Sequence, residues 1–173
     1  GPLATAGWLA GRWTPGHTVQ HGELLHPARP LNLHFTALDG GSTALQGHWI
    51  LLYASSATGC DARCHTALYD LRQVRLALGK DMQRVETVLL LDGAPDAALR
   101  QWLVHEHAAM RVGIVDVERQ NRLMEAFDHT GVIGDWIYLI DPLGNLLMRY
   151  PATVEPRGML KDLQRLLKWS RIG

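Results

Sequence analysis

The sequence predicts an α/β protein with a central mixed β-sheet and helices on both of its faces. Three observations predict this class: two nearly continuous apolar runs of strand length, amphipathic segments of helical period after them, and a hairpin pattern near the end. With 173 residues, of which 47% are hydrophobic and 20% charged, the chain has the composition of one globular domain. A chain of this length buries a substantial core without disulfide staples.

Residues 1–30 carry glycine, proline and scattered histidine without a clear period, and we interpret them as an extended N-terminal arm. The predicted domain therefore spans residues 31–173. The opening Gly1-Pro2-Leu3 is typical of a remnant of protein expression, so we expect that a native signal or membrane anchor preceded it. No apolar run in the sequence approaches the roughly 20 residues that cross a bilayer.

The first half of the domain begins with two strands. Apolar and polar residues alternate over 31–38, which predicts a half-buried strand, and the Asp-Gly-Gly run at 39–41 predicts a turn after it. Residues 48–53 are almost continuously apolar, which is typical of a central strand covered on both faces. Apolar residues then recur at helical spacing from 68 to 78, and Gly79 ends this predicted helix.

The second half repeats the alternation of strands and helices and closes with a hairpin and a helix. Asp141-Pro-Leu-Gly-Asn145 supplies the turn residues of that hairpin. The predicted elements are a strand at 85–91, a helix from 95 towards 107, a strand at 112–115, a helix at 118–127, strands at 136–140 and 146–150, and an amphipathic helix from 156.

The charges of the chain balance. Seventeen Lys and Arg residues face seventeen Asp and Glu residues, so the formal net charge is zero. Nucleic acids are bound through an excess of positive charge. We therefore expect no nucleic-acid partner, and the net charge of the whole chain does not favour an anionic membrane as partner either.

The two cysteines, Cys60 and Cys64, lie between the predicted central strand and the helix that follows it. In open α/β sheets, ligand chemistry gathers at this edge. A helix N-terminus favours the thiolate form of a cysteine, and Arg63 adds a positive charge between the two. The four-residue spacing places both sulfurs on one side of a helical turn.

Such a pair suits a disulfide or one soft metal ion. Zinc and iron–sulfur sites usually need four protein ligands, whereas Cu(I) tolerates few, so copper fits best among the metals. The alternative is a pair of buried, inert cysteines or a passive disulfide. Gly59, Asp61 and Arg63 beside the pair argue against burial in an apolar pocket.

From about residue 22 onward, the sequence resembles the Sco (SenC) family of cytochrome c oxidase copper-assembly proteins. The resemblance rests on the run GHWILLY at 47–53, on Cys60-x-x-x-Cys64 after it, and on the run YLIDPLG at 138–144. It implies a thioredoxin-like fold in a divergent member of the family. It also implies that copper, as Cu(I) or Cu(II), binds through Cys60, Cys64 and a distant histidine, for which Asp128-His129-Thr130 is the matching run.

The resemblance further implies a location and a partner. Sco proteins are held at the periplasmic face of the inner membrane, or in the intermembrane space, by one N-terminal helix. They serve the CuA site of the oxidase. For this chain we therefore expect an N-terminal membrane anchor, and as partner the oxidase subunit that carries CuA or another copper chaperone.

The sequence also departs from the family pattern. Asp61 and His65 stand where Sco proteins have prolines, and the segment at 131–135 lengthens the path from His129 to the next strand. If His129 does not reach the cysteines, the copper site is incomplete and thiol–disulfide oxidoreductase activity is the alternative function. Ordinary thioredoxins place a proline before the corresponding strand, and here Gly134-Asp135 precedes it. The missing proline favours the Sco family over a general disulfide oxidase.

Among the other histidines, His65 is the best candidate ligand. His65 adjoins Cys64, where an imidazole can tune a thiolate or bind metal. His105 and His107 share no helical face, and we expect both on a solvated helix end.

Overall fold

The computed structural model describes residues 21–31, 34–127 and 134–173. Eight strands and four α-helices follow one another in these parts of the chain, with one short 3₁₀-helix, η1. Their order is β1 (Glu23–Pro30), β2 (His34–Ala37), β3 (Ser42–Ala44), β4 (Trp49–Ser55), α1 (Ala62–Ala77), η1 (Gly79–Arg84), β5 (Val85–Leu91), α2 (Ala97–Glu106), β6 (Arg111–Ile114), α3 (Val117–Ala126), β7 (Trp136–Ile140), β8 (Asn145–Pro151) and α4 (Pro156–Trp169).

The strands form one mixed sheet in the order β1-β8-β7-β4-β5-β6-β2-β3. The three strands β4, β5 and β6 run parallel, and the remaining pairs are antiparallel. The central strand β4 pairs with β5 along its whole length, from Trp49 opposite Val85 to Ser55 opposite Leu91. The predicted mixed sheet is confirmed.

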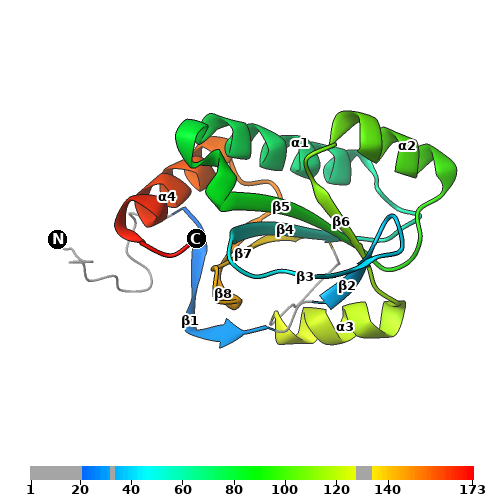
Figure 1. Ribbon diagram of the computed structural model, residues 1–173, viewed down its shortest axis with the longest axis horizontal. Coiled ribbons are helices and arrows are strands. Elements are labelled where there is room, and N and C mark those ends of the chain that lie inside the picture. Colours follow the sequence, from blue (N-terminus) through cyan, green and yellow to red (C-terminus); the bar gives the residue numbers. More distant parts are fainter. Residues whose placement is uncertain (1–20, 32–33, 128–133) are drawn as a thin grey trace.

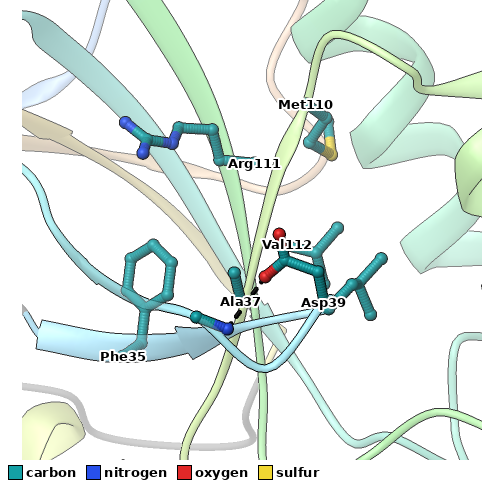
Figure 2. Close-up of a pocket in the computed structure, with 8 residues that line it drawn as sticks. Phe35, Ala37, Asp39, Met110, Arg111 and Val112 are labelled. Carbon is teal, nitrogen blue, oxygen red and sulfur yellow. Dashed lines mark hydrogen bonds between the residues drawn. The ribbon is translucent and has the colours of Figure 1, made fainter.

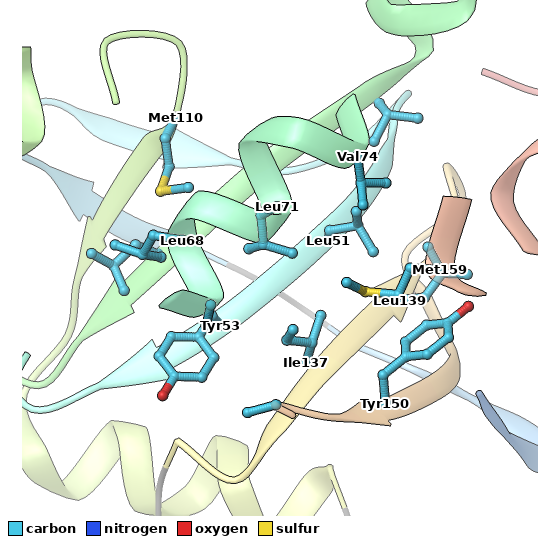
Figure 3. Packing of buried hydrophobic residues seen from close by; sticks show 14 of the residues in the cluster. Leu51, Tyr53, Leu68, Leu71, Val74, Met110, Ile137, Leu139, Tyr150 and Met159 are labelled. Atoms are coloured by element: carbon cyan, nitrogen blue, oxygen red, sulfur yellow. The ribbon is translucent and has the colours of Figure 1, made fainter. Parts of the chain in front are cut away.

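Helices cover both faces of this sheet. In Figure 1, α1, α2 and α4 lie over one face and α3 lies over the other. All seven residues of β4 are buried because alternate side chains enter two cores. Leu51 and Tyr53 lie in the core under α1 and α4 (Figure 3). Ile50 and Leu52 lie in the second core, which Phe127 closes at the end of α3.

Residues 23–30, predicted as part of the arm, belong to the sheet. Glu23–Pro30 forms the edge strand β1, which pairs with β8 with one irregularity in its register. Before this strand, the carboxylate of Asp162 on α4 accepts the backbone N–H groups of His21 (2.8 Å) and Gly22 (3.0 Å). An edge strand with an irregular register is held by backbone bonds and needs no strict alternation of side chains. The sheet therefore begins before the predicted boundary at residue 31.

The turn predicted at 39–41 is present, and a strand follows it that the sequence did not predict. Gly40 has a φ of 90°, and its N–H donates to the carbonyl of Ala37 (2.9 Å). After the turn, the three residues of β3 pair antiparallel with β2. A strand of three residues is too short for alternation to indicate it.

Side-chain caps define the starts of the first three helices. Asp61, Asp96 and Asp116 each accept the N–H of the residue three positions later. Pro156 opens α4, where a proline loses no helical hydrogen bond. None of the helices in the described ranges combines the length and the apolar content that crossing a bilayer requires.

Candidate functional site

Cys60 and Cys64 are joined by a disulfide at the N-terminal end of α1, with their Cα atoms 5.0 Å apart. The loop that leads from β4 to this disulfide is held by Asp92, whose carboxylate accepts the N–H of Ala57 (2.8 Å). Asp92 directly follows β5, the parallel neighbour of β4. The disulfide therefore lies at the carboxyl edge of the central strands, where the sequence places it.

Cys60 and Cys64 differ in their exposure to solvent. Cys64 is 1% exposed and belongs to the core under α1. Cys60 precedes the helix and is only half-buried. A thiol or thiolate of another molecule must reach a sulfur before it can exchange with it. Cys60 is therefore the accessible end of the disulfide.

Asp61 caps α1 between the two cysteines. Its carboxylate Oδ1 accepts the backbone N–H of Cys64 (3.0 Å). This hydrogen bond lowers the pKa of Asp61 below its ordinary value, with a smaller contribution from the positive charge of Arg63. Asp61, which stands where the resemblance leads one to expect a proline, thus starts the helix that carries Cys64.

The segment before β7 contacts the start of α1. The Arg63 Nη1 atom lies 2.6 Å from Asp135 Oδ1, and the Tyr53 hydroxyl donates a hydrogen bond to the carbonyl of Gly134 (2.9 Å). Gly134 has a φ of +91°, and a Cβ there would lie 2.8 Å from the Tyr53 oxygen. Backbone conformation and space both require glycine at this position.

Burial raises the pKa of Tyr53 above its ordinary value, and the nearby charge of Arg63 opposes this rise. The phenol therefore stays protonated and donates at neutral pH. The sequence assigned no role to Tyr53 or Asp135. The available signal was Gly134-Asp135 itself, a glycine and a carboxylate at the position where thioredoxins have proline.

The His65 side chain takes part in a contact between aromatic rings. Its ring stacks on Trp102 of α2, with centroids 4.2 Å apart and an interplanar angle of 16°. Trp102 in turn meets the ring of His107 edge-on at 5.0 Å. His65 is exposed and directly follows Cys64 in the sequence. Its ring is held by Trp102 of α2.

The expectation of a solvated position is wrong for His107, although His105 is exposed. His107 is 5% exposed, and its buried Nδ1 has no hydrogen-bond partner among the residues that the structure describes. Burial lowers the pKa of His107, and the charge of Arg72 adds to this effect. The ring lies beside Trp102 and near the charge of Arg72 on α1, and the pattern within α2 does not indicate this contact with another helix.

The predicted third copper ligand, His129, lies outside the described residues, so its place beside the cysteines stays a prediction. Within residues 21–31, 34–127 and 134–173, no three His, Cys, Asp or Glu side chains form a group that could hold a metal ion. Reduced Cys60 and Cys64 fit Cu(I) by their chemistry, because they supply two soft thiolates. The disulfide supplies none, so copper binding requires reduction first.

A pocket of about 420 Å³ lies elsewhere, between the β2–β3 turn and β6 (Figure 2). Phe35, Asp39 and Arg111 are among its lining residues. The Asp39 carboxylate is used within the turn, where it accepts the N–H of Gly41 (2.9 Å). The pocket contains neither cysteine and is not part of the disulfide site.

A disulfide at the carboxyl edge of a central strand, followed by a helix in a mixed sheet with helices on both faces, defines a thioredoxin-like protein. The sequence over residues 49–170 matches the model of the family described as the transmembrane-like, thioredoxin-like, C-terminal domain. The chain belongs to this family. Comparison with curated proteins finds no match.

Solved structures with the same fold include Sco proteins. Copper-bound ScoI of Bradyrhizobium japonicum is 20% identical, with a TM-score of 0.62 over 80% of this chain and 99% of that one. Yeast Sco1 is 16% identical, with a TM-score of 0.71 over 84% and 98%. The thioredoxin domain of a thiol-disulfide oxidoreductase from Bacteroides vulgatus is 15% identical, with a TM-score of 0.62 over 80% and 94%. The resemblance to Sco proteins is confirmed in the fold.

Proposed function

We propose that this domain is a Sco-like dithiol–disulfide protein that prepares the CuA copper site of cytochrome c oxidase. The observation that carries the proposal is the Cys60–Cys64 disulfide, with an accessible sulfur at Cys60 and a buried one at Cys64. An exposed attacking sulfur with a protected resolving sulfur behind it is the arrangement that thiol–disulfide exchange needs.

The exchange proceeds in two balanced steps. In the reduced domain, the Cys60 thiolate attacks one sulfur of a partner disulfide, a mixed disulfide forms, and the partner's other sulfur leaves as a thiolate. The Cys64 sulfur, after losing its proton, then attacks Cys60. The Cys60–Cys64 disulfide forms and the second partner thiolate leaves. The partner gains two electrons and this domain loses two, so an external dithiol must reduce the pair again.

The surroundings of the pair support the thiolate at Cys60. The free N–H groups at the start of α1 and the positive charge of Arg63 both stabilise a negative sulfur nearby. The Arg63–Asp135 and Tyr53–Gly134 contacts hold the neighbouring segment against the helix start. The segment at residues 134–135 therefore keeps its position beside the cysteines while they react.

Copper is the proposed cargo of the reduced pair. Two of the similar structures, ScoI of Bradyrhizobium japonicum and Arabidopsis thaliana ScoI, are described with copper bound. In this chain, Cys60 and Cys64 would supply two thiolates, and His129 is the proposed third ligand. Imidazole suits Cu(II) better than Cu(I), so His129 would matter most for the oxidised ion.

The second candidate function is thiol–disulfide exchange without copper. The similarity to thiol-disulfide oxidoreductases of Bacteroides favours it. The departures from the Sco pattern around His129 favour it as well. In this case Cys60 and Cys64 act as a redox pair only.

We further propose a location and a partner. The domain works at the periplasmic face of the inner membrane, held there by an N-terminal anchor. The description of one similar Bacillus anthracis structure as a SCO1/SenC family lipoprotein supports membrane attachment. The proposed partner is the oxidase subunit that carries CuA or another copper chaperone.

Anaerobic titration of the reduced domain with Cu(I) separates the two candidate functions. Binding of about one Cu(I) that is lost in both Cys60→Ser and Cys64→Ser supports the copper function, because one thiolate is a poor chelate. Unchanged affinity in either variant contradicts it. His129→Ala should weaken Cu(II) binding more than Cu(I) binding, with exposed His105→Ala as the matched control.

Trapping experiments test the order of attack. Cys64→Ser should accumulate a mixed disulfide with a partner through Cys60, whereas Cys60→Ser should not. Equal trapping by the two variants would contradict the proposed roles. A domain that exchanges disulfides but binds no copper would leave the second candidate function.

A further inference from the structure

The outer side of α4 carries a stripe of positive charge. Arg157, Lys161 and Lys168 follow one another at spacings of four and seven residues, which places them on one face, and all three are exposed. The helix contains a single carboxylate, Asp162, and its side chain is fully buried. We call Arg157, Lys161 and Lys168 the basic stripe.

Two large apolar side chains are exposed at the end of this helix. Trp169 is 76% exposed and Ile172 is 47% exposed. The Lys168 ammonium lies 5.6 Å from the centroid of the Trp169 ring. Tryptophan, lysine and arginine side chains are typical of protein surfaces at a membrane interface.

Hydrogen bonds hold this end of the chain in place. The Arg84 guanidinium donates to the carbonyls of Leu167 (3.0 Å), Ser170 (3.2 Å) and Ile172 (3.3 Å). The Trp49 indole N–H also donates to the carbonyl of Ile172 (3.2 Å). The backbone is thus bound on both sides of Trp169. Trp169 and Ile172 are therefore exposed on an ordered backbone and not on a frayed helix end.

The described chain enters the domain beside the same helix. The His21 N–H is held by Asp162 (2.8 Å), and a Cβ on Gly158 would lie 2.9 Å from the His21 side chain. Figure 1 shows β1 beginning next to α4. An N-terminal membrane anchor, as proposed above, would therefore reach the domain on the side that α4 occupies.

We propose that the basic stripe, together with Trp169 and Ile172, is a contact surface for an anionic membrane. The three cations pair with lipid phosphates, and the two apolar side chains enter the interface between headgroups and acyl chains. The contact orients the domain on the bilayer. It does not depend on the chemistry of Cys60 and Cys64, so its test and that of the proposed function can fail separately.

An acidic protein is the other partner that such charges could attract. Such a partner would use the basic stripe and would also gain from Trp169, because tryptophan is common at the centre of protein interfaces. The combination of cations, a tryptophan held outwards and the nearby N-terminal path favours lipid. Binding to soluble polyglutamate distinguishes an acidic protein partner from lipid.

The experiment is vesicle co-sedimentation of the whole chain. Vesicles of phosphatidylcholine with phosphatidylglycerol are compared with vesicles of phosphatidylcholine alone, at low and high salt. The charge-reversal variant Lys161→Glu/Lys168→Glu is compared with Lys80→Glu/Arg100→Glu, which makes the same change of charge at exposed positions on η1 and α2. Circular dichroism and thermal unfolding check that both variants fold.

We expect the chain to bind the anionic vesicles only, and salt to weaken this binding. Lys161→Glu/Lys168→Glu should lower the affinity by at least about tenfold, and the control pair should retain it, because each basic residue at the surface contributes severalfold. Acyl-chain-brominated lipids should quench the fluorescence of the wild-type chain more than that of Trp169→Phe. This comparison isolates Trp169 among the six tryptophans.

Three results would overturn the proposal. The first is absence of binding to anionic vesicles, and the second is an equal loss in both charge-reversal pairs. The third is that the chain binds soluble polyglutamate as tightly as it binds vesicles, and that Trp169→Ala changes neither of these two affinities. That last result would assign the basic stripe to an acidic protein.

Discussion

The guanidinium of Arg63, between the two cysteines in sequence, lies 2.6 Å from the carboxylate of Asp135, on the segment that leads into β7. Both side chains are partly exposed, 41% for Arg63 and 34% for Asp135. The contact ties the start of α1 to a segment 72 positions away in the chain. It also means that the positive charge nearest to the pair in sequence is shared with a carboxylate.

Removal of Asp135 should therefore make Cys60 more reactive. In reduced Asp135→Asn, the charge of Arg63 no longer faces this carboxylate, and a larger fraction of Cys60 should be thiolate at neutral pH. Arg63→Ala should have the opposite effect. The measurement is the rate of alkylation of Cys60 against pH, made in a Cys64→Ser background.

The matched control is Arg122→Ala, which breaks the exposed Glu118–Arg122 pair (2.8 Å) on α3. This variant should alkylate at the wild-type rate. Indistinguishable pH profiles for Asp135→Asn, Arg63→Ala and the control would contradict the prediction.

Gly134→Ala should destabilise the domain by roughly 1–3 kcal/mol, because alanine is strained at a positive φ. The added Cβ would also lie 2.8 Å from the Tyr53 oxygen. Tyr53→Phe alone should cost about 1 kcal/mol through its lost hydrogen bond. Urea unfolding of the two single variants and the double variant forms a cycle. The double variant should lose less than the sum, and strict additivity would contradict the steric part of the argument.

Stability should fall in mild acid because of His107. Burial lowers its pKa in the folded state, so the unfolded chain takes up the proton at a higher pH than the folded chain does. The stability present above about pH 6.5, the ordinary histidine value, is lost as pH falls through that value towards the folded-state pKa. We expect the urea midpoint to drop between about pH 7.5 and about pH 5.5.

His107→Phe should reduce that drop while it keeps a ring against Trp102. The exposed neighbour His105 provides the control, because His105→Ala should leave the pH dependence unchanged. An unaltered drop in His107→Phe would assign the acid sensitivity to other groups.

Asp162→Ala should release the first strand. Its carboxylate is fully buried and accepts the N–H groups of His21 and Gly22 and the hydroxyl of Tyr150 (2.9 Å). Burial and the negative charge of Asp162 raise the pKa of Tyr150 well above its ordinary value, so the hydroxyl remains a donor. Removal of the acceptor breaks these three hydrogen bonds and should cost at least about 3 kcal/mol.

Hydrogen exchange shows where that loss falls. The amides of β1 should lose protection first in Asp162→Ala, because the bonds that hold the chain just before this strand are gone. Tyr150→Phe removes one donor and keeps the acceptor, so it should cost about 1 kcal/mol. Protection of β1 equal to wild type in Asp162→Ala would mean that pairing with β8 alone holds the strand.

The strongest sequence predictions concern elements that a local pattern determines. The apolar runs of β4, β5 and β7 and the amphipathic pattern of α4 each lie within one segment, so their positions were predicted within a few residues. The cysteine pair belongs to the same class. Its place between a strand and a helix follows from neighbouring residues, whereas its proposed copper ligand His129 depends on a distant part of the chain.

Contacts between distant segments were decided only by the tertiary structure. β1 joins the sheet through backbone pairing with β8 and through Asp162, and neither leaves a period in residues 23–30. His107 is buried beside Trp102 and near the charge of Arg72 on α1. Tyr53 meets Gly134 across 81 positions. By itself the sequence determined most of the strands and helices, with β1 and β3 as the exceptions, and where the two cysteines lie. Long-range packing decided which side chains surround them, because those contacts depend on distances that no local pattern encodes.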